Sequence, residues 1–254
     1  RAAQTRAVFE ELLLHQLAVA SGDKTGLRGI AHLLNHEALA LHQLESQLSL
    51  SDPQEMVFDE IRRDLRRPTA MTRLLQGDVG SGKALIALLT ALLVGEAKAQ
   101  VCFIGPDDIA AEHRYLFAEP LLRAAGLVPQ LVSGKPSMAQ ADAIRRGEAH
   151  AVFASHALFE NFPEFKKLGL VIVEERAQFG VTDRKAICQK GVNPDLLVVT
   201  SVPIPLSLTF TVFSKHDLSV LREPMRQSVV TKVRGPTERE AAYATLREQL
   251  ELGR

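Results

Sequence analysis

Short apolar runs alternate with segments of helical periodicity between residues 72 and 200, and this alternation restricts the chain to a small number of folds. The runs are apolar throughout rather than at every second position, which is typical of strands buried on both faces. Buried strands separated by helices predict an α/β fold with a mostly parallel sheet. We expect strands at residues 73–76, 101–104, 128–132, 151–154, 170–173 and 196–200, with helices beginning at Lys83, Asp108 and Met138.

The segments on either side of this region are helical or polar. Ser51-Asp52-Pro53 combines a capping residue with a proline in the first turn, so it predicts a helix that begins there and ends near Leu65. After about residue 215 the strand rhythm stops. Other helical patterns cover residues 6–20, 36–47 and 238–252. We therefore expect a helical lead-in segment at 1–50, an α/β lobe at 51–215, and a linker with a helix at 216–254.

Charge and composition limit the partners of the chain. The 30 Lys and Arg residues balance the 30 Asp and Glu residues, whereas a stand-alone nucleic-acid binder usually carries a basic excess. Any DNA contact must therefore come from a local patch or from other parts of a larger protein. The most apolar stretch, Ala84–Val94, is too short to span a bilayer, so we expect no membrane partner and a cytoplasmic location. Cys102 and Cys188 lack the spacing of metal sites, and we expect free thiols.

The segment LLQGDVGSGKA at residues 74–84 carries the most specific chemical signal. Gly77, followed after four residues by Gly82 and Lys83, has the spacing of a phosphate-binding loop between a strand and a helix. Glycines let such a turn direct successive backbone N–H groups at phosphate oxygens, and the lysine reaches the terminal phosphates. The alternative is a glycine-rich turn without a ligand. Ala84 stands where a Ser or Thr hydroxyl normally binds Mg²⁺, so that metal ligand is missing.

Further segments extend this signal. The run MTRLLQGDVGSGK (71–83) resembles the sequence around the phosphate loop of the RecG family of ATP-dependent DNA helicases. LGLVIVEERAQFGV (168–181) resembles the acidic motif of that family, LGLVIIDEQHRFGV, and PDLLVVTSVPIPLSL (194–208) resembles its motif with TATPIPRTL. Shorter matches are ASHAL (154–158) to GTHAL, GPDDIAAEH (105–113) to APTEILAEQH, and FEELLLHQL (9–17) to the helix before the motor. The matches occur in the family order and cover nearly the whole chain.

The resemblance implies a RecA-like lobe, a three-layer sandwich of a superfamily 2 motor that uses ATP and Mg²⁺ on branched or forked DNA in repair and recombination. It also implies a wedge domain and a second RecA-like lobe as partners in the parent chain. By this resemblance, Gln54 recognises the adenine base. The nucleotide-binding residues are Gln54, Gly77, Asp78, Val79, Gly80, Ser81, Gly82, Lys83 and Ala84. The catalytic residues are Lys83, Glu174 and Glu175, of which Glu174 supports Mg²⁺ and Glu175 positions the attacking water. The residues implied to contact DNA are Asp107, Ser133, Gly134 and Ser155. Those implied to couple hydrolysis to DNA movement are Thr200 and Ser201.

The sequence departs from the family pattern at residues that handle ATP and DNA. Glu174 replaces an aspartate, and a displaced carboxylate can cost about a hundredfold in rate. The other departures are Arg176, Ala177 and Gln178 for Gln-His-Arg, Asp107 for a threonine that meets a DNA phosphate, and Leu206 for an arginine. The hydrophobic frame of the family is retained.

Two functional interpretations follow. The first is the N-terminal motor lobe of a RecG-like helicase or translocase, whose ATP hydrolysis requires the arginine finger of the second lobe. The second is a degenerate, catalytically weak or inactive lobe that serves as a nucleotide- or DNA-binding scaffold. A small-molecule kinase would use the same loop, but the sequence offers no lid or acceptor site. Whether ATP is hydrolysed is left open by the sequence.

Several polar residues have structural interpretations beside functional ones. Arg62, Arg63, Arg66 and Arg67 form a basic face of one predicted helix, which either meets DNA phosphates or lies solvated. The apolar neighbours of His156 favour a structural or coupling role over general-base catalysis. His36, His42 and His113 lack partners for a metal site. Asp78 is expected to shape the loop, and the Glu174–Glu175 pair has the alternative of an exposed strand end.

Overall fold

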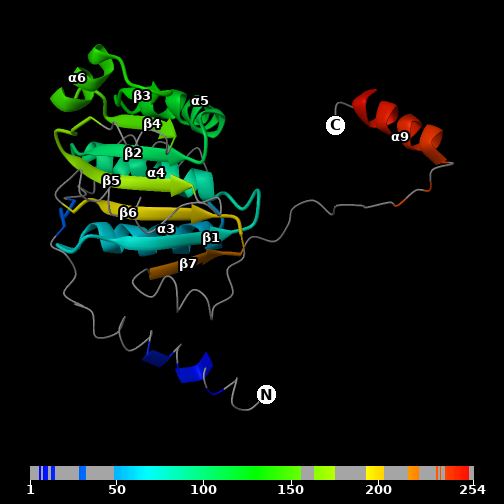
Figure 1. The fold of residues 1–254 in the computed structure, drawn as a ribbon, viewed down its shortest axis with the longest axis horizontal. Helices are drawn as coiled ribbons and strands as arrows, with labels where there is room; N and C mark the ends of the chain where they lie inside the picture. The colour runs from blue at the N-terminus through cyan, green and yellow to red at the C-terminus, as the bar shows by residue number, and fades with distance from the viewer. Residues whose placement is uncertain are drawn as a thin grey trace. The chain divides into compact units, whose positions relative to one another are not determined.

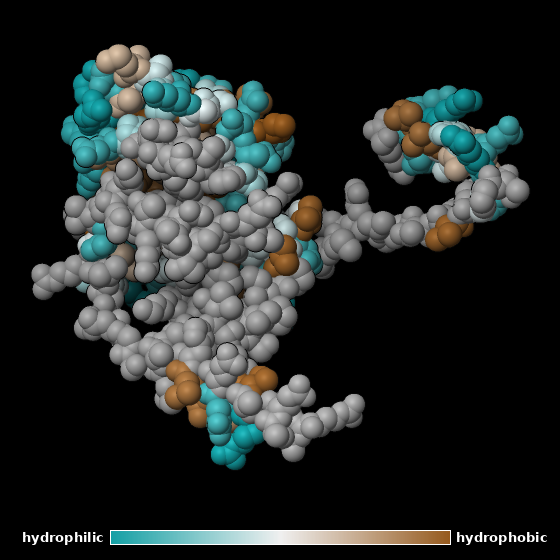
Figure 2. Space-filling view, in the orientation of Figure 1, coloured by the Kyte–Doolittle hydropathy of each residue, from teal (hydrophilic) through white to brown (hydrophobic). Residues whose placement is uncertain are grey.

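The computed structural model describes residues 6, 8–10, 13–14, 29–32, 49–155, 163–174, 193–202, 217–222, 233, 235 and 238–251. The chain divides into two compact units, Arg1–Glu223 and Pro224–Arg254. The second unit contains helix α9 (Arg239–Glu251), which confirms the helix expected at 238–252 (Figure 1). None of the residues of α9 is buried, and Figure 2 shows both hydrophilic and hydrophobic residues on the surface of this helix. Within the part of the chain that the structure describes, every helix falls short of the length and apolarity that a bilayer crossing demands.

The first unit contains a seven-stranded sheet in which every pairing is parallel (Figure 1). The strands are β1 (Thr72–Gly77), β2 (Gln100–Gly105), β3 (Pro129–Val132), β4 (Ala151–Ser155), β5 (Leu168–Glu174), β6 (Asp195–Thr200) and β7 (Asp217–Leu221). Their order across the sheet is β3-β4-β2-β5-β6-β1-β7. The first six confirm the predicted strands within a few residues, because each is a short apolar run that the fold buries on both faces.

β7 corrects the expectation that the strand rhythm stops near residue 215. This strand pairs with β1, from Arg73 opposite Asp217 to Gly77 opposite Leu221. It lies at the edge of the sheet, and only Ser219 and Leu221 of its residues are buried. An edge strand of this kind lacks the continuous apolar run that marks a central parallel strand, so the sequence pattern missed it. The first compact unit accordingly runs past β7 to Glu223.

The described helices lie on both faces of the sheet, as in a three-layer sandwich. The helices are α3 (Asp52–Leu65), α4 (Lys83–Glu96), α5 (Asp108–Ala124) and α6 (Met138–Arg146) in this region. α3, α4 and α5 share one core with Phe103 and Phe153, which stack with ring centroids 4.5 Å apart. α6 packs on the opposite face, where Ile144 meets Val152, because neighbouring residues of a strand point to opposite faces.

The start of α3 confirms the predicted cap. The Ser51 hydroxyl accepts a hydrogen bond from the backbone N–H of Gln54 at 3.4 Å, and the Gln54 side chain accepts one from the backbone N–H of Ser51 at 3.2 Å. This reciprocal capping box satisfies two of the N–H groups that a helix start leaves without partners. It also fixes the side chain of Gln54 at the beginning of α3.

Residues 29–32 lie against the amino ends of the central strands. The Nε2 atom of His32 lies 2.9 Å from Oδ2 of Asp195, and Oδ1 of Asp195 accepts a hydrogen bond from the backbone N–H of Met71 at 2.6 Å. Both side chains are buried, and this burial raises the pKa of the Asp195 carboxyl. The helix expected at 36–47 lies outside the described residues, and of the one expected at 6–20 only residues 6, 8–10 and 13–14 are described, all of them helical.

Candidate nucleotide-binding site

The loop at residues 77–83 joins the carboxyl end of β1 to the first turn of α4. Gly80 and Gly82 have φ angles of 83° and 91°, in the left-handed region that glycine adopts at little cost. A Cβ atom at Gly82 would also displace the Nε2 end of the Gln54 side chain from its present position. The first N–H groups of α4 have no partner within the helix, and the loop directs them to the same place. The local geometry therefore matches the predicted phosphate-binding loop.

Lys83 opens α4 and folds its ammonium group back over the loop. Its Nζ atom donates hydrogen bonds to the carbonyl oxygens of Gly77 and Asp78, each at 2.6 Å. Burial lowers the pKa of the Lys83 ammonium, while the charges of Asp78 and Glu174 act in the opposite direction and Arg114 adds to the lowering. The positive charge is thus held at the loop before any ligand arrives, where a phosphate group can replace the two carbonyl contacts.

Gln54 supports the loop from the side of α3. Its Nε2 atom donates a hydrogen bond to the carbonyl oxygen of Ser81 at 3.0 Å, while its Oε1 atom accepts from Ser51. The side chain therefore ties the start of α3 to the phosphate loop. This position beside the loop is compatible with the predicted contact to adenine, which stays a prediction.

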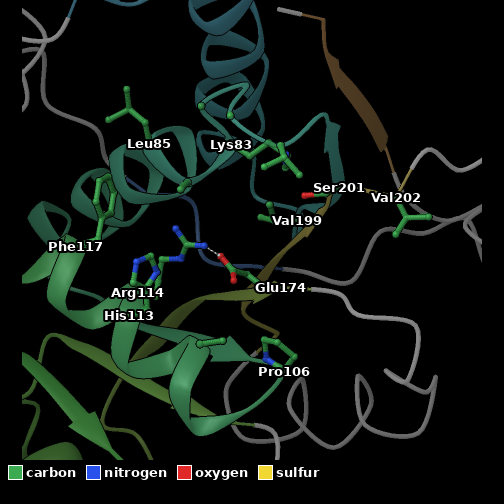
Figure 3. A pocket seen from close by; sticks show the side chains of 15 residues that line it. Lys83, Leu85, Pro106, His113, Arg114, Phe117, Glu174, Val199, Ser201 and Val202 are labelled. Carbon is green, nitrogen blue, oxygen red and sulfur yellow. Dashed lines mark ion pairs between the residues drawn. The ribbon is translucent and has the colours of Figure 1, made fainter. Parts of the chain in front are cut away.

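A pocket of about 780 Å³ opens beside the loop (Figure 3). Its size lies within the usual range of small-molecule sites. The walls come from the loop and the start of α4, the first half of α5, and the carboxyl ends of β5 and β6. Its lining residues are Val79, Gly80, Gly82, Lys83, Ala84, Leu85, Pro106, Ala110, His113, Arg114, Phe117, Glu174, Val199, Ser201 and Val202.

The carboxylate of Glu174 at the end of β5 is paired with a side chain that the sequence analysis missed. Nη2 of Arg114, on α5, forms an ion pair with Oε1 of Glu174 (Figure 3). Only 23% of the Arg114 side chain and 26% of the Glu174 side chain are exposed. A sequence signal for Arg114 did exist, because it shares the helical spacing of Ala111, Ala118 and Leu122, the buried residues of α5. A charged residue on an otherwise apolar stripe indicates a specific partner.

The described residues do not form a site suited to the Mg²⁺ ion that this class of motor implies. Mg²⁺ requires oxygen ligands, whereas Ala84 presents a methyl group and Glu174 is already bound to Arg114. Across the described ranges, no group of three or more His, Cys, Asp or Glu side chains is arranged to hold a metal ion. Glu175 lies outside the described residues, so its predicted role toward water stays a prediction.

The predicted coupling and DNA-contact residues also lie at carboxyl ends of strands. Thr200 ends β6, where its hydroxyl accepts a hydrogen bond from the backbone N–H of Val202 at 3.1 Å, and Ser201 lines the pocket. Ser155 ends β4 and is buried, and its hydroxyl has no partner within the described part of the chain. The residues Ser133 and Gly134 follow β3 and are exposed.

The strand order separates these residues into two groups along one edge of the sheet. β5, β6 and β1 are adjacent and end in the nucleotide and coupling residues, whereas β3, β4 and β2 are adjacent and end at the predicted DNA residues. Asp107 belongs to the second group, but its carboxylate caps α5 by accepting a hydrogen bond from the backbone N–H of Ala110 at 2.7 Å. This cap gives Asp107 a structural role, and its predicted DNA contact stays a prediction.

The four arginines at the end of α3 make mostly local contacts. Arg62 donates a hydrogen bond to Asp59 at 3.3 Å, and its guanidinium lies 4.4 Å from the centre of the Phe58 ring. Arg67 pairs with Asp64 at 3.0 Å. These contacts favour the structural interpretation of the basic face over DNA binding. His156 and Leu206 lie outside the described residues.

Comparisons with known proteins agree with this arrangement. A family profile described as DEAD/DEAH box helicase matches residues 51–200. The chain is 34% identical to the ATP-dependent DNA helicase RecG of Aquifex aeolicus over 98% of this chain and 33% of that protein. It is 38% identical to the RecG of Pasteurella multocida over 94% of this chain and 36% of that protein. It therefore spans about a third of the length of the curated relatives it matches.

A solved structure extends the similarity to three dimensions. The structure of RecG bound to a three-way DNA junction matches with a TM-score of 0.76 and 26% sequence identity, over 99% of this chain and 35% of that chain. The seven-stranded parallel sheet is accordingly a RecA-like fold. Because the family profile covers more than half of its residues and spans the phosphate loop, the chain belongs to the DEAD/DEAH box helicase family and is similar to RecG over nearly its whole length.

Proposed function

We propose that this chain is the first motor lobe of a RecG-like helicase and that it binds ATP at the loop of residues 77–83. The phosphate loop carries this proposal, because its two left-handed glycines, the start of α4 and the buried Lys83 all face a pocket of nucleotide size. Membership of the helicase family supports ATP as the nucleotide. Gln54, which ties α3 to the loop, is the residue proposed to recognise adenine.

The proposal extends to the parent protein, of which this chain would be a part. We infer that the parent acts on branched or forked DNA, because the matching RecG structure was solved on a three-way junction. Within the chain, the lead-in segment, the motor lobe and the linker are proposed parts, with the lobe extended to include β7. A wedge domain, a second RecA-like lobe and a cytoplasmic location remain predictions from the family resemblance.

Replacing Lys83 with alanine should weaken ATP binding to the 254-residue chain by roughly tenfold or more, because charge-assisted hydrogen bonds to phosphate are among the stronger polar contacts. Isothermal titration calorimetry with ATP measures this directly. Lys167→Ala is the matched control, since Lys167 is exposed and precedes β5 at the opposite edge of the sheet. Equal ATP affinity in the wild type and Lys83→Ala would contradict the proposed site.

A lobe that binds nucleotide without turning it over is the second candidate function. Two observations favour it, the methyl group of Ala84 and the ion pair that engages Glu174. The two candidates differ in steady-state ATPase of the full-length protein with junction DNA. Turnover stimulated by branched DNA supports a motor, whereas ATP binding without stimulated turnover supports a scaffold.

A further inference from the structure

The pocket beside the phosphate loop contains two cationic side chains and one carboxylate. Lys83 enters it from α4, Arg114 from α5 and Glu174 from the end of β5 (Figure 3). Resting on the proposed nucleotide site, we propose that Arg114 provides the fixed positive charge for the terminal phosphates, so that the chain binds a nucleoside triphosphate without a divalent cation. Glu174 then serves as the partner of the guanidinium in the absence of nucleotide, rather than as a metal ligand.

The charge distribution in the pocket supports this assignment. A triphosphate at a phosphate loop usually shares its charge between the lysine and a divalent cation, which a hydroxyl and an acidic side chain help to hold. Here Ala84 lacks the hydroxyl, and the guanidinium of Arg114 already neutralises the acidic side chain. A cation that binds Glu174 would have to displace the guanidinium from that carboxylate. The arginine is thus the cation that this pocket already contains.

The guanidinium of Arg114 has hydrogen-bonding capacity to spare. An arginine carries five N–H donors, and in this structure Nη2 is the atom that pairs with Glu174. Its Nε atom is buried and lacks a partner among the residues that the structure describes. A buried donor without a partner is uncommon and indicates an occupant that completes the site. Arginine also suits phosphate because its planar fork can bind two oxygens at once.

A rigid element presents Arg114 to the pocket. Asp107 caps the start of α5, and Ala111, Ala118 and Leu122 bury one face of the helix against the core. The guanidinium therefore approaches the phosphate loop from a packed helix of the same lobe. Side chains on packed helices are positioned more precisely than side chains on loops. We therefore expect Arg114 to meet a bound phosphate without a large movement.

The test measures ATP and ADP binding to the 254-residue chain by calorimetry, once with Mg²⁺ and once with EDTA. We expect the wild-type affinity for ATP to differ by less than about threefold between the two conditions, because arginine keeps its charge in both. Arg114→Gln should weaken ATP binding in EDTA by roughly tenfold or more. The loss should be smaller for ADP, which lacks the terminal phosphate.

Glu174→Gln separates the two possible roles of the carboxylate. If Glu174 pairs with Arg114 and competes with phosphate for the guanidinium, the variant should bind ATP more tightly than the wild type in EDTA. If Glu174 is a metal ligand, the variant should instead bind ATP more weakly in Mg²⁺ and unchanged in EDTA. This readout does not depend on whether Arg114→Gln folds well.

Arg123→Gln is the matched control, because Arg123 lies on the same helix and pairs with Glu119 at 2.9 Å on the exposed face. It should bind ATP like the wild type. A wild-type affinity that falls tenfold or more in EDTA, or an Arg114→Gln variant that binds like Arg123→Gln, overturns the inference but leaves the nucleotide site standing. If the wild type binds no ATP in either Mg²⁺ or EDTA, the proposed function is overturned as well.

Discussion

A triple variant with Ala84→Thr, Arg114→Ala and Glu174→Asp should bind ATP on the order of a hundredfold more tightly in Mg²⁺ than in EDTA. Changes around a metal site alter metal affinity by about ten- to a hundredfold, and here two ligands are restored together. The Ala84→Thr change supplies the hydroxyl, Glu174→Asp supplies the shorter carboxylate, and Arg114→Ala leaves that carboxylate free. Calorimetric titrations of ATP in Mg²⁺ and in EDTA provide the ratio.

Ala84→Thr alone is the informative control for this experiment. It restores the hydroxyl but leaves the Arg114–Glu174 ion pair intact, so its ATP affinity should remain nearly independent of Mg²⁺. Strong Mg²⁺ dependence in this single variant would show that the missing hydroxyl was the whole difference. A triple variant that remains indifferent to Mg²⁺ would show that residues outside this pocket exclude the metal.

Arg73→Ala should lower the free energy of unfolding by roughly 3–5 kcal/mol, the usual cost of removing one partner from a buried ion pair. The guanidinium of Arg73 is buried in β1. It donates hydrogen bonds to Asp64 at 2.5 and 2.9 Å, to Glu60 at 3.0 Å and to Ser219 at 2.7 Å. Without it, the buried carboxylate of Asp64 keeps, among the described residues, the ion pair with Arg67, whose side chain is 62% exposed. Urea denaturation followed by circular dichroism measures the change.

Arg145→Ala tests whether the loss is specific to the buried network. Arg145 pairs with Asp142 at 2.6 Å, but both side chains are about half exposed, so the expected change is within about 1 kcal/mol. An Arg73→Met, Asp64→Leu double variant should recover part of the loss, because it removes both charges rather than leaving one buried. A loss below about 1 kcal/mol for Arg73→Ala would contradict the importance of this network.

The Arg73 network also bears on the nucleotide site. It joins α3, β1 and β7, and the backbone of Leu221 at the end of β7 would lie 3.0 Å from a Cβ atom at Gly77. β7 therefore supports the strand from which the phosphate loop leaves. The sequence pattern could not predict this support. An arginine inside a strand and an edge strand with few apolar residues both lack the continuous apolar pattern of buried core strands.

The sequence by itself determined the elements that short-range chemistry controls. Ser51 with Pro53 and Gln54 began α3 where expected, the glycines at 80 and 82 shaped the phosphate loop, and six apolar runs became strands. These features depend on neighbours within a few residues of one another, namely capping hydrogen bonds, backbone conformations open to glycine, and continuous burial. The ordered motifs added the resemblance to RecG, which the similarity to RecG proteins over nearly the whole chain confirms.

The tertiary structure alone decided which distant charges meet. Arg114 and Glu174 are far apart in the chain, and they pair only because β2 and β5 are adjacent in the sheet and α5 follows β2. His32 reaches Asp195 because residues 29–32 are hydrogen-bonded to the end of α3 and the segment between α3 and β1, and Arg73 reaches Ser219 through the pairing of β1 with β7. Such contacts depend on strand order, which hydrophobic patterns do not specify because every central parallel strand looks alike in sequence. For this reason the phosphate loop was predictable, whereas the pairing of Arg114 with Glu174 beside it was not.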